Sequence, residues 1–199
     1  MTDKVKTEIE KLIKKLKLNC SIEQFKDKVS WWDISYSQKL SEDFIKEFKN
    51  KVDWENISMF QKLSEDFIRE FQDKVDWIYI SIHQKLSENF IREFQDKVNW
   101  YNISYYQTLS EDFIREFKNK VEWVRISIYQ ILSEAFIREF QDKVSWNYMS
   151  IWQTLSENFM KEFKYKLDLD YLLRNEKISQ EFYYSLIHER ITRFELMDI

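Results

Sequence analysis

The 199-residue chain contains no glycine and no proline. No position can therefore use the residue that most readily adopts a left-handed backbone, and no helix is broken by a residue without an amide N–H. Hairpin-rich β folds depend on glycine-containing turns, so the composition argues against them. The loops that cradle nucleotide phosphates also need glycine, and neither familiar type can be present.

Cysteine and histidine are nearly absent as well, with one cysteine, Cys20, and two histidines, His83 and His188. A single cysteine cannot form an internal disulfide, and a reducing, intracellular location is the simplest interpretation. Neither histidine has a cysteine or a second histidine at the spacing of a metal site, so we expect no metal and no cofactor. We expect both histidines to be exposed and Cys20 to act as a small apolar filler.

Long apolar runs are also missing. Residues 1–17 alternate charged and apolar side chains, which is unlike a signal peptide, and no segment approaches a membrane span. We therefore expect no membrane partner and a cytoplasmic location. The formal net charge of −4 argues mildly against nucleic acid, whose phosphates call for a basic surface.

The feature that organises the chain is an internal repeat of 23 residues. The block Leu-Ser-Glu-Asp-Phe-Ile-Lys-Glu-Phe begins at Leu40, a diverged copy precedes it at residues 17–39, and a degraded copy follows at 178–199. Close copies of the block begin at Leu63, Leu86, Leu109, Leu132 and Leu155. Repeat arrays need modified ends because a terminal unit has no neighbour to cover its apolar face.

Each repeat reads as two short helices. In residues 40–62, Ser41 is a helix N-cap and the following apolar residues lie on one face, which predicts a first helix, helix A, from Glu42 to Lys51. Acid-to-lysine pairs four residues apart within helix A should support it. A second N-cap position then precedes helix B, and it holds Ser30, Asp53, Asp76, Asn99, Glu122 and Ser145 in successive repeats.

Helix B begins with tryptophan, and Trp, Ile, Ser and Gln recur along one of its faces, for example Trp54, Ile57, Ser58 and Gln61. Helices of about ten residues are marginal alone, so stacking of neighbouring repeats must stabilise them. The sequence predicts an all-α fold, an α-solenoid with capping helices at both ends. We expect one domain over residues 1–199, with an N-terminal cap helix at 1–16, repeats at 17–163, and a diverged C-terminal repeat and cap at 164–199 (Tyr171, Leu172, Phe182, Leu186, Ile191, Phe194).

Repeats differ mainly at four positions of helix B, its second, third, sixth and seventh residues, which lie opposite the Trp–Ile–Ser–Gln stripe. The sixth position is always apolar, which favours packing between repeats: Tyr36, Met59, Ile82, Tyr105, Ile128 and Ile151. The other three positions mix charges, amides and aromatics. They suggest a partner-binding face formed by Trp32, Asp33, Glu55, Asn56, Phe60, Ile78, Tyr79, His83, Tyr101, Asn102, Tyr106, Val124, Arg125, Tyr129, Asn147, Tyr148 and Trp152, with neutral surface drift as the alternative.

Catalysis finds no support in the sequence, and we predict a non-enzymatic scaffold. Carboxylate pairs such as Glu42 and Asp43 recur in nearly every repeat, whereas a catalytic group needs one distinctive environment. We assign no catalytic and no metal-binding residues.

Protein or peptide is the partner that we favour. A single-stranded nucleic acid read at one base per repeat is the main alternative, but only Arg125 is basic on the variable positions. Lys39, Lys62 and Lys85 follow helix B in the early repeats and give way to Thr108, Ile131 and Thr154 later. Self-association through the exposed aromatics is a third possibility.

The block Leu-Ser-Glu-Asp-Phe-Ile-Arg-Glu-Phe, with Lys-Val-Asp-Trp and Ile-Ser-x-x-Gln-Lys, resembles short helical repeats in proteins of giant amoeba viruses. The similarity covers about residues 17–165, and both ends depart from the motif. This resemblance implies a viral or similarly AT-rich source, but it implies no activity and lends no functional residues.

Overall fold

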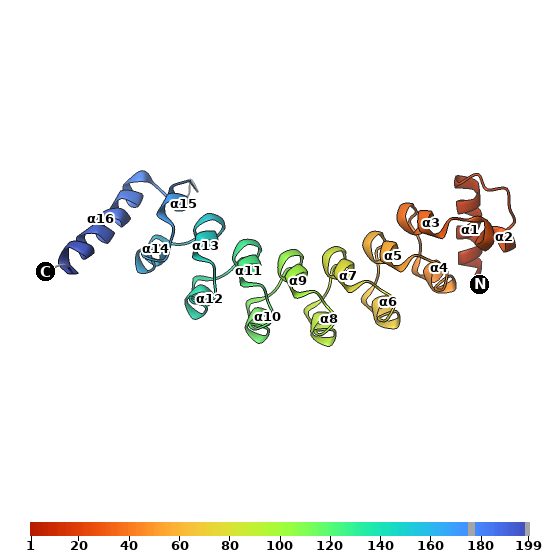
Figure 1. Ribbon diagram of the computed structural model, residues 1–199, viewed down its shortest axis with the longest axis horizontal. Coiled ribbons are helices and arrows are strands. Elements are labelled where there is room, and N and C mark those ends of the chain that lie inside the picture. The colour runs from red at the N-terminus through yellow and green to blue at the C-terminus, as the bar shows by residue number, and fades with distance from the viewer. Residues whose placement is uncertain (175–177, 198–199) are drawn as a thin grey trace. The chain divides into compact units, whose positions relative to one another are not determined.

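The computed structural model describes the backbone of residues 1–174 and 178–197, and the side chains of residues 1–174 and 178–190. In these ranges the chain forms helices joined by short turns and contains no strand, which confirms the predicted α-solenoid with terminal caps (Figure 1). The chain divides into two compact units, Met1–Asn99 and Trp100–Ile199. The expectation of a single domain stays a prediction.

The first unit begins with α1 (Asp3–Lys15) and α2 (Ile22–Lys28). Helices B and A then alternate as α3 (Trp31–Ser37), α4 (Glu42–Glu47), α5 (Trp54–Phe60), α6 (Glu65–Glu70), α7 (Trp77–His83) and α8 (Glu88–Glu93). The second unit continues the alternation with α9 (Trp100–Tyr106), α10 (Glu111–Glu116), α11 (Trp123–Tyr129), α12 (Glu134–Glu139), α13 (Trp146–Trp152) and α14 (Glu157–Glu162), and ends with α15 (Leu169–Arg174) and α16 (Gln180–Met197).

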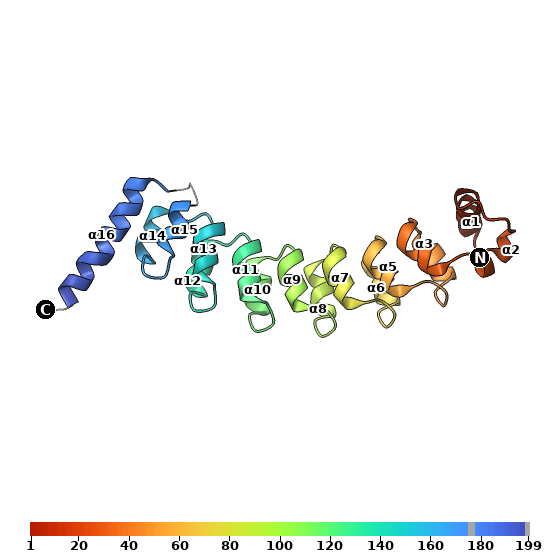
Figure 2. The same ribbon diagram turned by 45° about the horizontal axis from the view of Figure 1, so that its top comes forward.

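Within each unit, helices B lie side by side in one row and helices A in a second row (Figures 1 and 2). Neighbouring helices B pack against each other, α3 on α5 and α5 on α7 in the first unit, and α9 on α11 and α11 on α13 in the second. The row of helices B therefore presents one side to the repeat core and the other side outward.

Helix A is shorter than predicted. It covers six residues, Glu42–Glu47 in α4, and does not reach Lys51. The carbonyl of Phe48 accepts the N–H groups of both Lys51 and Val52, at 2.8 and 3.1 Å, so the chain turns there without any glycine. The predicted cap is confirmed, since the Ser41 hydroxyl accepts the N–H of Phe44 at 3.1 Å.

Ion pairs on helix A run between repeats as well as within one. Lys46 pairs with Glu70 of the next repeat at 2.5 Å, in place of the expected Glu42. Arg69 shows both arrangements, with Glu65 four residues earlier at 3.8 Å and Glu93 of the next repeat at 2.7 Å. Because a six-residue helix has little room for internal pairs, the longer-range pairs tie neighbouring helices A together.

The helix B caps agree with the prediction in three repeats. Asp53 accepts the N–H of Asn56 at 2.8 Å, and Ser30 and Asp76 cap their helices in the same way. Glu122 and Ser145 also occupy the N-cap position, as predicted, but neither makes a side-chain cap bond. Their backbone N–H groups are bound by a serine of the preceding repeat, at 3.0 and 2.9 Å, as those of Asp53 and Asp76 are.

The core is built from the same residues of every repeat. In residues 40–62 these are Leu40, Phe44, Ile45, Val52 and Ile57, all less than 9% exposed. They come from both helices and from the turn that joins them, so neither helix can bury its apolar face alone. This explains how helices of six and seven residues persist, although such helices are unstable in isolation.

The tryptophan of each helix B joins two repeats. The Trp77 ring is half-buried and faces the rings of Phe90 and Phe94 in the next helix A, with centroids 6.2 and 5.0 Å away. Its indole N–H donates to the carbonyl of Gln72 at 2.9 Å, and Lys97 lies over the ring at 6.0 Å. The predicted Trp column is therefore part of the inter-repeat packing, although it is not fully buried.

Buried serine and glutamine side chains connect the backbones of neighbouring repeats. Ser58 is fully buried, donates to the Trp54 carbonyl at 2.7 Å and accepts the N–H of Asp76 at 2.9 Å. Gln61 accepts the N–H of Leu40 at 2.9 Å and donates to the Gln38 carbonyl at 2.8 Å. These side chains satisfy backbone groups that the short helices leave unpaired.

The N-terminal cap substitutes for a missing repeat. In later repeats the first acidic residue of helix A holds the next N-cap serine, as Glu65 holds the N–H of Ser87 at 2.6 Å. The diverged first copy has Asn19 at that position, and Glu8 of α1 binds the N–H of Ser41 instead, at 2.9 Å. Helix α1 therefore acts as the predicted cap, with Val5, Ile9 and Leu12 buried.

At the other end, Leu172, Phe182 and Leu186 are buried and Tyr171 is half-buried, in agreement with a C-terminal cap. The side chains of Ile191 and Phe194, also expected there, lie outside the described residues. Arg190 of α16 donates to the carbonyls of Lys164 and Leu167, each at 2.7 Å, and its partial burial lowers the pKa of the guanidinium. These bonds hold α16 to the turn after α14.

Candidate interaction face on helix B

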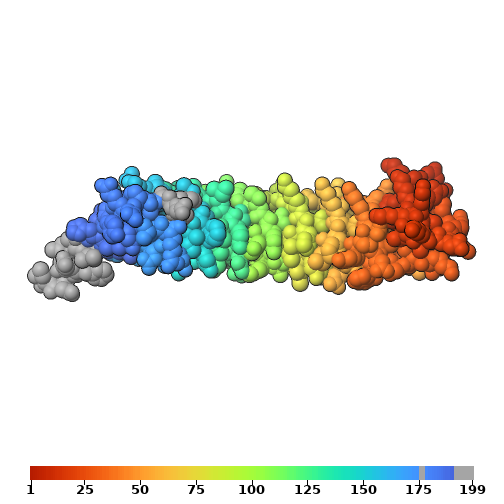
Figure 3. Space-filling view, turned by 90° about the horizontal axis from the view of Figure 1, so that it is seen from above, coloured from red at the N-terminus to blue at the C-terminus, as the bar shows by residue number. Residues whose placement is uncertain are grey.

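The variable face consists of the second, third, sixth and seventh residues of each helix B. Its second and seventh residues are exposed in all six helices from α3 to α13, and its third residue ranges from exposed to buried. The sixth residue is half-buried in every helix except α3, where Tyr36 is exposed because no helix B precedes it. Figure 3 views the molecule from the side on which the helices B of each unit lie.

Exposed apolar side chains gather on this face. In the described part of the chain, fifteen large apolar residues are exposed, and ten of them belong to the variable face: Trp32, Tyr36, Phe60, Ile78, Tyr101, Tyr106, Val124, Tyr129, Tyr148 and Trp152. No large apolar side chain of helices A from α4 to α14 is exposed. The two rows of helices therefore differ sharply in what they present to the solvent.

In the first unit, the face combines aromatics with two acids. The rings of Trp32 and Tyr36 stack at 5.4 Å, and Tyr36 meets Phe60 of the next helix B edge to face at 4.7 Å. Asp33 is exposed next to the first pair, and Glu55 is exposed on α5. Asn56 is half-buried, while Ile78 and His83 of α7 are exposed.

Tyr79 and Glu55 form a polar contact across two repeats of this unit. The Tyr79 hydroxyl donates to Oε1 of Glu55 at 3.4 Å. The negative charge of Glu55 raises the pKa of Tyr79 above its usual value of 10.0, with further contributions from partial burial, the hydrogen bond itself and Asp76. Tyr79 therefore stays a hydrogen-bond donor over a wider pH range than a free phenol.

In the second unit, four tyrosines and one arginine form a cluster on α9 and α11. The ring of Tyr105 lies 4.2 Å from that of Tyr106 and 4.1 Å from that of Tyr129. The Arg125 guanidinium lies over the rings of Tyr101 and Tyr105, at 4.7 and 5.3 Å, and donates to the Tyr101 hydroxyl. A hydrogen bond with Tyr105 is the main cause that raises the pKa of Tyr129.

The remaining predicted residues of the second unit separate into exposed and buried ones. Val124, Asn147, Tyr148 and Trp152 are exposed, with Trp152 reaching 58%. Asn102 is only 8% exposed, so it cannot offer a surface to a partner, and its inclusion in the binding face was wrong. The half-buried sixth positions agree with their interpretation as packing residues.

The outer side of helix A has a different character, because it carries a row of ion pairs. Arg115 pairs with Glu139 of the next repeat and with Asp112 of its own helix, at 2.7 and 2.8 Å, and these bonds raise the pKa of its guanidinium. Arg138 pairs with Glu162 at 2.8 Å. Exposed pairs of this kind contribute little to stability, but the charged groups that form them on helix A already have partners.

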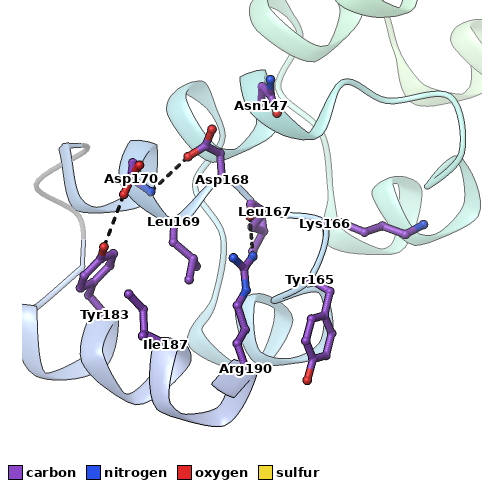
Figure 4. A pocket seen from close by; sticks show the side chains of 10 residues that line it. All are labelled: Asn147, Tyr165, Lys166, Leu167, Asp168, Leu169, Asp170, Tyr183, Ile187 and Arg190. Atoms are coloured by element: carbon purple, nitrogen blue, oxygen red, sulfur yellow. Dashed lines mark hydrogen bonds between the residues drawn. The ribbon is translucent and has the colours of Figure 1, made fainter. Parts of the chain in front are cut away.

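A pocket of about 430 Å³ lies at the C-terminal end of the second unit (Figure 4). Its polar groups are already used by the fold. Arg190 binds the carbonyl of Leu167, Asp168 accepts the N–H of Asp170, and the Asp170 side chain accepts the hydroxyl of Tyr183 at 3.5 Å. The pocket is therefore best explained as a gap beside the C-terminal cap.

A metal site requires several histidine, cysteine or acidic side chains close together. In the described ranges, no three such residues form a group that could hold a metal ion. Both histidines are exposed, and Cys20 is half-buried with a free thiol. None of the helices in these ranges combines the length and apolar character needed to cross a membrane.

Sequence reasoning assigned no role to the lysines that follow helix B. The structure places Lys62 and Lys85 on a common pocket with Phe60 and His83. The sequence does contain a signal, because this repeat position holds lysine in the first unit and no lysine in the second. The pocket itself forms between two helix ends, and a repeat pattern does not reveal it.

Comparison with models of protein families found no match, and searches among curated proteins and solved structures found no similar chain. The resemblance to repeats of giant amoeba viruses stays a prediction.

Proposed function

We propose that this chain is a non-enzymatic repeat scaffold that binds a protein or peptide through the variable face of helix B. One observation carries the proposal: ten of the fifteen exposed large apolar side chains in the described residues lie on this face, and none lies on helices A from α4 to α14. Random surface drift would scatter such residues over both rows of helices. Concentration on one face is typical of an interaction surface.

The residue types also favour binding. Tyrosine, tryptophan and arginine are the most frequent binding hot spots, because they bury large areas and still offer a polar group. Tyr101, Tyr106, Arg125 and Trp152 are of these types and are exposed or half-buried. The frame beneath them is held by buried serine and glutamine side chains, so exchange of outer residues leaves the repeat bonds in place.

A protein partner fits the charge of the face better than a nucleic acid does. Phosphate contacts dominate nucleic-acid affinity, and they require several cations along the binding track. Arg125 is the only arginine or lysine on the variable face, which also carries the acids Asp33 and Glu55. Aromatic and amide groups without a cationic row are suited to a peptide surface.

The proposal is tested with the double variant Tyr101→Ala/Tyr106→Ala. Both rings are about half exposed, so the variant should melt like the parent chain while losing the capture of its partner. The matched control is Tyr165→Ala/Tyr184→Ala, which removes two exposed tyrosines of the same unit that lie off the face. Capture is measured by pull-down from cell extract with mass spectrometry, with and without nuclease.

We expect the face variant to lose the proteins that the parent chain captures, and the control variant to keep them. Equal loss in both variants, or capture that disappears with nuclease, would contradict the proposal. Light scattering of the purified chain tests self-association. If the parent chain is a dimer and the face variant is a monomer, the partner is a second copy of this chain.

A further inference from the structure

A pocket of about 420 Å³ lies at the C-terminal ends of α5 and α7, within the first unit. The residues that line it are Met59, Phe60, Gln61, Lys62, Leu63, His83, Gln84 and Lys85. No aspartate or glutamate is among its lining residues. The pocket is therefore both cationic and partly aromatic, and it adjoins the variable face through Phe60 and His83, the seventh residues of their helices.

The two lysines have no partner in the described part of the chain. Neither Lys62 nor Lys85 takes part in an ion pair, a hydrogen bond or a ring contact, and both are exposed. Some cations of the same unit pair with carboxylates, as Lys46 does with Glu70 and Lys97 with Asp73. Lys62 and Lys85 differ from the other exposed lysines in lining a common pocket. The side-chain amides of Gln61 and Gln84 are bonded to backbone groups, so the polar side chains that remain available in the pocket are those of Lys62, Lys85 and His83.

The fold does not need these lysines. A lysine after a helix can stabilise the negative end of the helix dipole, which would be a purely structural role. At the same position the second unit carries Thr108, Ile131 and Thr154, and its helices B have the same length. Since those helix ends form without a cation, the cations of the first unit call for another explanation.

We propose that this pocket binds a carboxylate side chain of an acidic segment in the protein partner, an inference that rests on the proposed function. Two ammonium groups and an imidazole can donate to a carboxylate, and the Phe60 ring can cover an apolar neighbour of that acid. Glu55 stands five residues before Phe60 on α5, about 7.5 Å along the helix axis, and Asp33 lies on α3. A continuous phosphate backbone would meet these acids, whereas a single carboxylate enters the pocket without approaching them.

The test uses the intact chain as bait for a random peptide library displayed on phage, and measures selected peptides by fluorescence anisotropy. The variant is Lys62→Thr/Lys85→Thr, which installs the residue found at Thr108 and Thr154 and should not change the melting temperature. The matched control is Lys26→Gln/Lys49→Gln. It removes the same charge from exposed sites of this unit, at the repeat position where Gln72 stands.

We expect the selected peptides to share an aspartate or glutamate beside an apolar residue. Their affinity should fall about tenfold or more in the pocket variant, because charge-assisted bonds are lost, and should be unchanged in the control. Peptides that lack acids, or that bind the pocket variant normally while losing affinity for Tyr101→Ala/Tyr106→Ala, would overturn this inference and leave the proposed function standing. Lysine-dependent binding of oligothymidylate in place of peptide would overturn it as well.

Discussion

Gln84 donates from Nε2 to the carbonyl oxygen of Gln61 at 2.8 Å, and Gln61 holds the same place in the preceding repeat. Gln84 also accepts the N–H of Leu63 at 3.0 Å and reaches the carbonyl of Ser58 at 3.3 Å. One buried side chain thus satisfies two carbonyl groups of the preceding repeat and the first N–H of its own repeat. Gln38, at the start of the array, has no such neighbour, and its buried Oε1 has no hydrogen-bond partner.

This difference predicts unequal effects of one substitution at two equivalent sites. Gln84→Leu should lower the free energy of unfolding by about 2–4 kcal/mol, because it leaves three buried backbone groups unpaired. Gln38→Leu should change it by less than about 1 kcal/mol, since its Oε1 is already unpaired and its Nε2 donates only to the hydroxyl of the adjacent Ser37. Urea unfolding followed by circular dichroism measures both. Equal losses would show that the glutamines act through packing alone.

Trp77→Ala should destabilise the first unit by about 2–4 kcal/mol, somewhat less than the loss of a fully buried tryptophan. The ring is half-buried against Phe90 and Phe94, and the indole N–H bond to the Gln72 carbonyl is lost with it. Trp77→Phe keeps an aromatic ring but not the donor, and should cost about 1 kcal/mol. If Trp77→Ala melted at the same temperature as the parent chain, the tryptophans of helix B would not contribute to stability.

The repeat phase, the helix A caps and the apolar core could be read from the sequence because each is a local pattern. Ser41 before acidic residues, and Phe44 and Ile45 on one face, have the same meaning in any helix. The end of helix A could not be read in this way. Nothing in residues 49–51 forbids a helix, and the turn is set by the bonds to the Phe48 carbonyl.

Burial on the variable face was only partly predictable for a related reason. Asn56 and Asn102 occupy the same repeat position and are the same residue type, yet one is half-buried and the other buried. The difference depends on the side chains around each one, which a position in a repeat does not specify. The pocket with Lys62 and Lys85 was missed because it forms between two helix ends.

Two isoleucines of α7 separate binding positions from packing positions. Ile78, the second residue, is 52% exposed, whereas Ile82, the sixth, is half-buried. Ile82→Ala should lower the free energy of unfolding by about 1–2 kcal/mol, and Ile78→Ala should change it by less than about 0.5 kcal/mol. The two variants have identical chemistry on one helix, so each controls the other in chemical denaturation. A larger loss for Ile78→Ala would mean that the second position belongs to the core.

The Tyr79–Glu55 contact predicts a titration that one substitution should shift. The Glu55 carboxylate raises the pKa of Tyr79 above 10.0 because ionisation of the phenol would place a second negative charge beside it. The folded state therefore holds this proton more tightly than the unfolded state. The resulting contribution to stability is fully present below pH 10 and is lost as the pH rises through the folded pKa.

Carbon-13 NMR of labelled tyrosine, with Tyr79→Phe for assignment, can follow this group among the others. Glu55→Gln should bring the pKa of Tyr79 down toward 10, with part of the rise kept because partial burial and Asp76 also contribute. Asp33→Asn removes a charge from the same face on α3 and serves as the control. A Tyr79 pKa that responds equally to both substitutions would mean that the general charge of the face governs it, and not the contact at 3.4 Å.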